Sequence, residues 1–138
     1  MSRSNYSEDY DERFPNALEF YRRNVENAIY GKRGQAFIRE LIEALDAMPE
    51  KRLAAEYLEY GGEVCAIGSV GRKRGMDMSG IESYNAPVVA KAFGIAECMV
   101  REITFENDEG AGYWTIDEAP EKRWQRMRDW AARNMKSE

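Results

Sequence analysis

The sequence contains no histidine. Because histidine is the side chain most often used as a general acid or base near neutral pH, its absence argues against most acid–base enzymes. Cysteine is also scarce, since only Cys65 and Cys98 are present, far apart and without a CxxC motif. A zinc site is therefore not expected, and we predict two reduced, buried cysteines, because disulfides are rare in cytosolic proteins.

Long hydrophobic runs are missing as well. No apolar stretch approaches the roughly 20 residues that a membrane-spanning helix requires. Residues 1–13 are polar and acidic, so they lack the apolar region of a signal peptide. We therefore expect a cytoplasmic protein that does not associate with membranes.

Motifs for catalysis, nucleotide binding and metal binding are incomplete or missing. Ser69 follows Gly68 directly, whereas a nucleophile elbow has another residue between the glycine and the serine. The glycines around residues 72–74 have neither the spacing nor the final Lys-Ser/Thr pair of a Walker loop. The acidic run 106–109 lacks the ligand spacing of an EF-hand. We predict a protein that is not an enzyme and has no metal and no cofactor.

The composition suits one folded domain. Of the 138 residues, 43% are apolar and 12% aromatic, which is typical of a globular protein. Acidic side chains crowd residues 8–12, so we expect residues 1–13 to form a flexible acidic arm. Residues 14–138 are predicted to form a single helical domain. The net charge of −5 does not favour nonspecific binding to nucleic acid.

Two amphipathic helices are predicted between Asn16 and Met48, and the rest of the fold is expected to pack on them. Apolar side chains three or four residues apart mark one stripe on each helix. The stripes are Leu18, Tyr21, Val25, Ala28 and Ile29, then Phe37, Ile38, Leu41, Ile42, Leu45 and Met48. Asn16 is expected to cap the first helix, and Gly31 to end it in the left-handed region. The short connection predicts that these helices are antiparallel neighbours.

Further helices are predicted along the rest of the chain. Apolar spacing indicates a third helix over 50–60, ended by Gly61-Gly62. Segment 64–71 is interpreted as a helix, with a short buried strand as the alternative. A helix follows the expected cap Asn85, and a final helix after the expected cap Asp117 contains the stripe Trp124, Met127 and Ala131. The predicted fold is mainly α, a bundle of about five helices with room for one short β-hairpin near Gly61–Val70.

Residues 89–103 resemble the helix-turn-helix signature of bacterial regulators. Ala90 is the small residue where the two helices would cross, and Gly94 supplies the turn. The predicted core positions are Ile95, Val100 and Ile103. A recognition helix here would present two glutamates, whereas bases and phosphates are contacted mostly by Arg, Lys, Asn and Gln. We therefore expect this segment to serve packing, and DNA binding is the alternative.

Several basic and aromatic residues are candidates for binding a partner. The triplet Arg72-Lys73-Arg74 suits the last turn of a helix, where cations complement the dipole, and it also offers a patch for an anion or an acidic partner. Tyr113 and Trp114 follow a glycine-rich turn, where they either anchor a partner or fold back over the core. Candidates for contacting nucleic acid or an anion are Lys32, Arg33 and Arg101.

A resemblance to known sequences is carried by several short segments. They are Phe14-Pro15-Asn16, Tyr21-Arg22-Arg23-Asn24, Gly31-Lys32-Arg33-Gly34-Gln35, Glu63-Val64-Cys65-Ala66-Ile67-Gly68, Phe93-Gly94-Ile95 and Glu106-Asn107-Asp108-Glu109. Together they resemble a loose group of short, uncharacterised proteins encoded by bacteriophages and prophages. The likeness covers roughly residues 14–134. It implies a bacterial host cell, in which small phage proteins without an enzyme signature often act by binding host machinery, including defence systems.

The functional hypothesis combines these points. The chain is expected to be a non-enzymatic, phage-type accessory protein that binds and modulates a bacterial host protein or complex. Its most concrete form is a counter-defence protein that resembles an anti-CRISPR inhibitor. The alternatives are a helix-turn-helix DNA-binding regulator and a protein that sequesters a small phosphorylated signal.

Overall fold

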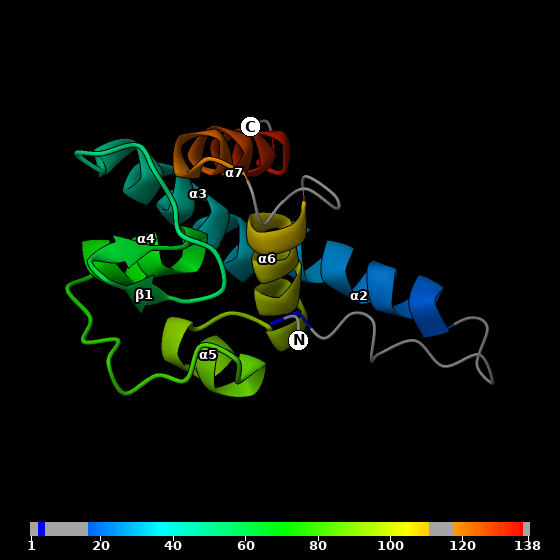
Figure 1. The fold of residues 1–138 in the computed structure, drawn as a ribbon. Coiled ribbons are helices and arrows are strands. Elements are labelled where there is room, and N and C mark those ends of the chain that lie inside the picture. The colour runs from blue at the N-terminus through cyan, green and yellow to red at the C-terminus, as the bar shows by residue number, and fades with distance from the viewer. Residues whose placement is uncertain (1–2, 5–16, 111–117, 137–138) are drawn as a thin grey trace.

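The computed structural model describes residues 3–4, 17–110 and 118–136 (Figure 1). Within these ranges the chain forms six helices and one short antiparallel hairpin, so the predicted mainly α fold with a hairpin is confirmed. The helices are α2 (Ala17–Tyr30), α3 (Lys32–Ala47), α4 (Ala66–Lys73), α5 (Ala86–Phe93), α6 (Glu97–Glu109) and α7 (Pro120–Arg133). The strands are β1 (Glu59–Tyr60) and β2 (Glu63–Val64), with Glu59 opposite Val64.

Helix α6 lies at the centre of the molecule (Figure 1) and packs against α2, α4, α5 and α7. Its side chains Met99, Val100 and Ile103 are buried in the core. Helix α3 packs against both α4 and α7, and its stripe residues Ile38 and Leu41 are fully buried. The core therefore lies between α3, α4 and α6. Its buried apolar side chains form one hydrophobic cluster.

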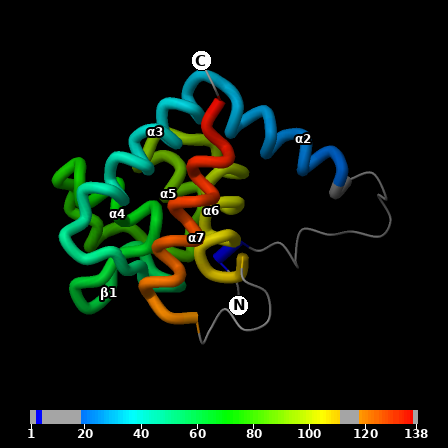
Figure 2. Tube along the Cα trace, turned by 90° about the horizontal axis from the view of Figure 1, so that it is seen from above, coloured from blue at the N-terminus to red at the C-terminus, as the bar shows by residue number. Residues whose placement is uncertain are grey.

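The connection between α2 and α3 differs from its prediction. Gly31 is the single residue between the helices and has extended backbone angles, φ −73° and ψ 170°, not the left-handed ones expected of it. The helices meet at an open elbow instead of lying antiparallel (Figure 2), and α2 packs on α6 as well as on α3. Gly34 makes the elbow possible, because a Cβ there would overlap the Ala28 carbonyl oxygen. The close approach of α3 to the end of α2 sets their angle.

The predicted helix over 50–60 is wrong, because this segment is irregular and leads into β1. Its backbone N–H groups bond to distant partners: Leu53 N donates to Pro120 O at 3.0 Å, and Ala54 N donates to Val64 O at 2.8 Å. The apolar spacing that resembled a helical stripe instead reflects burial of Leu53 and Leu58. Both hairpin-tip glycines have positive φ, which is the requirement of a tight two-residue hairpin turn.

The remaining helices follow their predictions, apart from one cap. Segment 64–71 contributes most of α4, which ends at the basic triplet and at Gly75 with φ +73°. The Asn85 side chain caps α5 by accepting from Val88 N, and Gly94 adopts the left-handed conformation between α5 and α6. Pro120 opens α7, whose N-cap is Ala119, so the expected cap Asp117 is wrong because the helix begins later in the chain. The helix-turn-helix-like segment is therefore present as α5, the Gly94 turn and α6.

Further predictions are met in part or concern residues outside the described ranges. Arg3 and Ser4, within the expected flexible arm, are buried. Cys65 is a buried free thiol as predicted, and Cys98 is a half-buried free thiol. The positions outside the described ranges are Asn16 and Asp117, the aromatic candidates Tyr113 and Trp114, and the rest of the arm. None of the described helices is both long enough and apolar enough to cross a bilayer.

Candidate functional site

Three exposed tyrosines form an aromatic patch that the sequence prediction missed. Tyr57, Tyr60 and Tyr84 expose 39%, 69% and 38% of their surface. The rings of Tyr57 and Tyr60 stack with centroids 5.0 Å apart, and Tyr84 meets Tyr57 edge-on at 6.2 Å. We call these three residues the tyrosine patch.

The backbone around the tyrosine patch is held by long-range hydrogen bonds. Leu58 N, between the first two tyrosines, donates to Ser83 Oγ at 3.0 Å and so ties the hairpin segment to the loop that carries Tyr84. Leu58 O accepts from Cys65 N at 3.2 Å, which fixes the same segment to the start of α4. The rings are therefore presented by a supported surface.

The chain around the patch is acidic. Glu56, Glu59 and Glu82, each within two residues of a patch tyrosine, are all exposed. Burial, followed by the negative charge of Glu56, raises the pKa of Tyr84 above its ordinary value. The Tyr84 phenol therefore remains protonated at physiological pH and can donate a hydrogen bond. Together, aromatic rings and carboxylates suit a partner surface that carries basic side chains.

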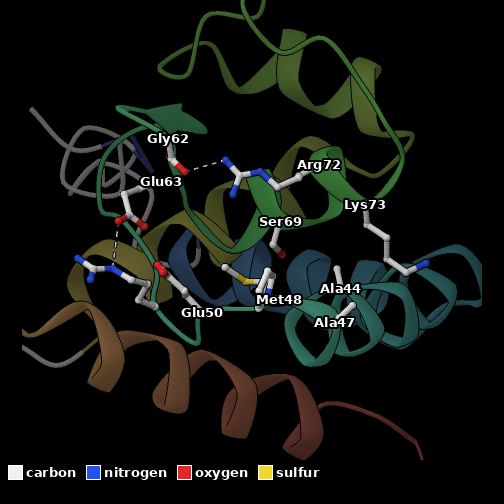
Figure 3. A pocket seen from close by; sticks show the side chains of 11 residues that line it. Ala44, Ala47, Met48, Glu50, Gly62, Glu63, Ser69, Arg72 and Lys73 are labelled. Carbon is white, nitrogen blue, oxygen red and sulfur yellow. Dashed lines mark hydrogen bonds and ion pairs between the residues drawn. The ribbon is translucent and has the colours of Figure 1, made fainter.

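Two residues of the predicted basic triplet border a cleft between α3, the hairpin and α4 (Figure 3). The cleft measures about 360 Å³, and its floor includes Ala44, Ala47 and Met48. Arg72 donates to Gly62 O at 2.9 Å and pairs with Glu59 at 3.3 Å. A size of this order suits a small molecule.

The rim of the cleft is charged, and its three cations Arg52, Arg72 and Lys73 each lie within 4 Å of a carboxylate. Arg52 lies 3.0 Å from Glu63, and Lys73 lies 3.9 Å from Glu43. Ser69 lines the cleft and donates its hydroxyl to Ala66 O at 2.6 Å, so the hydroxyl is engaged by backbone. Over the described part of the chain, no cluster of three His, Cys, Asp or Glu residues could hold a metal ion.

Arg74, the third residue of the triplet, connects the end of α4 with α3 and α5. Its guanidinium makes two hydrogen bonds to the Glu40 carboxylate, at 2.7 and 2.6 Å, and one to Phe93 O at 3.2 Å. It also lies 5.9 Å from the Phe37 ring centre and 5.7 Å from that of Phe93. The hydrogen bonds from Arg74 hold the pKa of Glu40 below its ordinary value. The three residues of the triplet therefore differ in position, because Arg72 and Lys73 border the cleft and Arg74 does not.

The other predicted basic residues, Lys32, Arg33 and Arg101, do not form a single patch. Lys32 and Arg33 are exposed in the first turn of α3 and line a hollow of about 200 Å³ between the elbow and the α5–α6 turn. Arg101 does not line this hollow and instead pairs with Glu97 at 3.0 Å along α6.

The proposed recognition helix of the helix-turn-helix segment is covered by α2. Glu102 of α6 is buried and pairs with Arg22 of α2 through hydrogen bonds of 2.8 and 3.1 Å. Cys98 Sγ on α6 lies 3.7 Å from Asn24 O on α2. Because α6 packs on four neighbouring helices, it is poorly placed to enter a major groove. This geometry favours the packing role that the sequence predicted.

Comparisons of the chain with protein-family models, with curated proteins and with solved structures return no match. The candidate sites therefore depend on their own geometry. The tyrosine patch had a weak signal in the sequence, since Tyr57 and Tyr60 lie just before the turn residues Gly61-Gly62. That signal was lost because residues 50–60 were interpreted as a helix.

Proposed function

We propose that this protein is a non-enzymatic binding protein that contacts a protein partner through the tyrosine patch. The observation that carries the proposal is the packing of three exposed tyrosines on a hydrogen-bonded backbone. Tyrosine is enriched among residues that dominate binding energy, because it offers a large rigid surface at a low conformational-entropy cost. Rings that are already packed lose little further freedom when a partner docks.

The partner class follows from charge and from the sequence resemblance. The exposed carboxylates of Glu56 and Glu82 favour a partner surface rich in Lys or Arg, whereas Glu59 pairs with Arg72. The resemblance to phage and prophage proteins supports a bacterial host protein or complex in the cytoplasm as the partner. Inhibition of a host defence complex, in the manner of an anti-CRISPR protein, is the concrete form of this proposal.

The test is affinity capture from a bacterial lysate with matched surface variants. The wild-type chain is compared with a variant in which Tyr57, Tyr60 and Tyr84 are all replaced by Ser. Phe20→Ser is the control, because Phe20 on α2 is 64% exposed and lies on a different element. We expect one specific partner to be retained by the wild type and by the control, and lost with the triple variant. A partner held equally by all three chains would reject the patch as the binding surface.

A second candidate function is supported by the cleft beside α4. Its apolar floor and the cations Arg52, Arg72 and Lys73 on its rim suit a small molecule with an apolar body and an anionic group. A phosphorylated signal that is sequestered there should raise the melting temperature, since a ligand that binds only the folded state stabilises it. A thermal-shift panel of nucleotides and inorganic phosphate, with Arg72→Gln as the comparison, tests this function. No shift at millimolar ligand would reject it.

DNA binding as a regulator has the least support of the three functions. The covered position of α6 and the acidic net charge both oppose it. A gel shift at low salt on the DNA upstream of the gene is the measurement, because the phosphate contribution to binding is strongest there. A salt-sensitive shift would restore this function, and no shift would end it.

A further inference from the structure

Arg3 occupies a closely fitted site at the C-terminal end of α6. Its Nε and Nη2 atoms each donate to the Asp108 carboxylate at 2.7 Å, one to each oxygen. Its Nη1 atom lies 3.6 Å from Cys65 Sγ at the start of α4. The Arg3 residue is 3% exposed, and the Asp108 side chain is 9% exposed. A side-on carboxylate in a buried setting recognises the planar guanidinium group in a way that an ammonium group cannot reproduce.

The groups that receive Arg3 are positioned by other parts of the fold. Asp108 Oδ1 also accepts from Asn107 Nδ2 at 2.8 Å and from Glu56 N at 3.0 Å. Cys65 Sγ accepts from Gly68 N at 3.4 Å as the cap of α4. These contacts do not involve Arg3, so they would hold the site in shape without it. We call Asp108, Cys65 and the Glu56 backbone the arginine socket.

The arginine socket contains the nearly buried carboxylate of Asp108, which needs a cation to balance its negative charge. A second guanidinium, that of Arg123, lies in the same region, where it donates to Asn107 O at 3.2 Å and to Leu53 O at 3.0 Å and pairs with Glu118 at 3.5 Å. The bidentate contact to Asp108 is made by Arg3. Removal of Arg3 would therefore leave a buried carboxylate without its bidentate partner, which is costly in a low-dielectric setting.

We propose that the arginine socket is a ligand-binding site for an arginine side chain, filled by Arg3 in the free protein and able to accept the arginine of a peptide in trans. The ligand class follows from the side-on carboxylate and the buried surroundings. The socket adjoins the tyrosine patch through Glu56, whose backbone N–H donates to Asp108. The two proposals are distinguished by their readouts, since the peptide-dependent melting temperature tests the socket and partner capture tests the patch. Accessibility of the socket to a peptide is the feature that the experiment tests.

The experiment uses the full chain with Arg3→Ala, which empties the socket, and a peptide of residues 1–8 as the probe. Melting temperature is measured against peptide concentration. We expect the variant to melt below the wild type and the peptide to raise its melting temperature saturably. The same peptide with Lys in place of Arg should have little effect, and the wild type, whose socket is filled, should not respond.

A second measurement shows where the peptide binds. Chemical-shift mapping of the variant should move the Glu56 and Asp108 amides when peptide is added. The proposal is overturned if the variant shows no peptide-dependent shift, or if the Lys peptide or the wild type responds equally. Should Arg3→Ala prevent folding, the Arg3→Gln chain takes its place, because glutamine is polar but supplies no cation to Asp108, and the same criteria apply.

Discussion

The side-chain oxygen of Asn107, near the end of α6, accepts a hydrogen bond from the Ala66 backbone N–H at 3.0 Å. Ala66 is the first residue of α4, whose free N–H groups need partners, so α6 caps α4 from a distance of 41 residues in sequence. Asn107 Nδ2 also donates to Ala54 O at 3.0 Å. One buried amide therefore connects α6, α4 and the irregular segment before β1.

Replacement of Asn107 should be strongly destabilising. Asn107→Ala leaves the Ala66 N–H and the Ala54 carbonyl without this partner in the core, and unsatisfied buried polar groups cost about 1–3 kcal/mol each. We expect a loss of about 2–4 kcal/mol in the free energy of unfolding, measured by urea denaturation. Asn24→Ala, on the exposed face of α2, is the control and should change stability by less than about 0.5 kcal/mol. Equal effects of the two substitutions would contradict the capping role.

Gly68 in α4 should tolerate no side chain. A Cβ at this position would overlap the Leu58 carbonyl oxygen, which is backbone and cannot move aside cheaply. Gly68→Ala is therefore expected to destabilise by about 3 kcal/mol or more through overpacking and backbone shift. Gly80→Ala is the matched control, since a Cβ there meets nothing within 4 Å. Wild-type melting temperatures for both variants would contradict the close packing of α4 against Leu58 O.

Arg74 is expected to act through stability, in contrast to its neighbour Lys73. Arg74→Ala removes the bidentate contact with Glu40 and the stacking between two phenylalanine rings, so we expect a loss of about 1–3 kcal/mol. Lys73→Ala should cost less than about 0.5 kcal/mol, because its pairing is long and exposed. A double-mutant cycle of Arg74→Ala with Glu40→Gln should show a coupling of about 1 kcal/mol. Additive effects would show that the pair does not interact.

Acid should destabilise the fold through carboxylates that are bonded to arginines. Hydrogen bonds from Arg126 hold the pKa of Glu118 below its ordinary value. Because the unfolded chain binds protons more readily at this carboxylate, the stability it contributes is present above about pH 4.5 and is lost as pH falls through the folded-state pKa. Melting temperatures between pH 7 and pH 3 should fall less steeply in Glu118→Gln than in the wild type.

Glu106 is the internal comparison for this pH series. Burial, followed by the charge of Glu102, raises the pKa of Glu106, so its ionised form opposes folding at neutral pH. Glu106→Gln should therefore raise the melting temperature at pH 7, and its advantage should shrink as pH falls and the wild-type carboxyl is protonated. Lower stability of Glu106→Gln at pH 7 would contradict the assigned sign.

Local patterns predicted the helices because their evidence lies within a few residues of sequence. The stripe of α3 and the Gly94 turn depend on spacing and on glycine conformation, which short-range chemistry determines. The segment 50–60 was misinterpreted because its hydrogen-bond partners, Pro120 and Ser83 among them, come from distant parts of the chain. Helical spacing alone could not reveal those partners.

The candidate site was harder to predict for the same reason. The tyrosine patch joins Tyr57 and Tyr60 with Tyr84 across a loop, and the arginine socket joins Arg3 to a carboxylate 105 residues away. The basic triplet was correctly located at the end of a helix, but sequence could not show that Arg74 is committed to Glu40. Pairing between distant segments is visible only in the fold.

The dissociation constants of single tyrosine variants for the captured partner show whether the tyrosine patch is the binding surface. Tyr60 is the most exposed ring of the patch, so Tyr60→Ser should preserve the fold while removing a contact. We expect the dissociation constant to rise at least about tenfold, which corresponds to about 1.4 kcal/mol, while Phe20→Ser leaves it unchanged. An unchanged dissociation constant for Tyr60→Ser, or an equal loss for Phe20→Ser, would contradict the proposal that this protein binds its partner through the tyrosine patch.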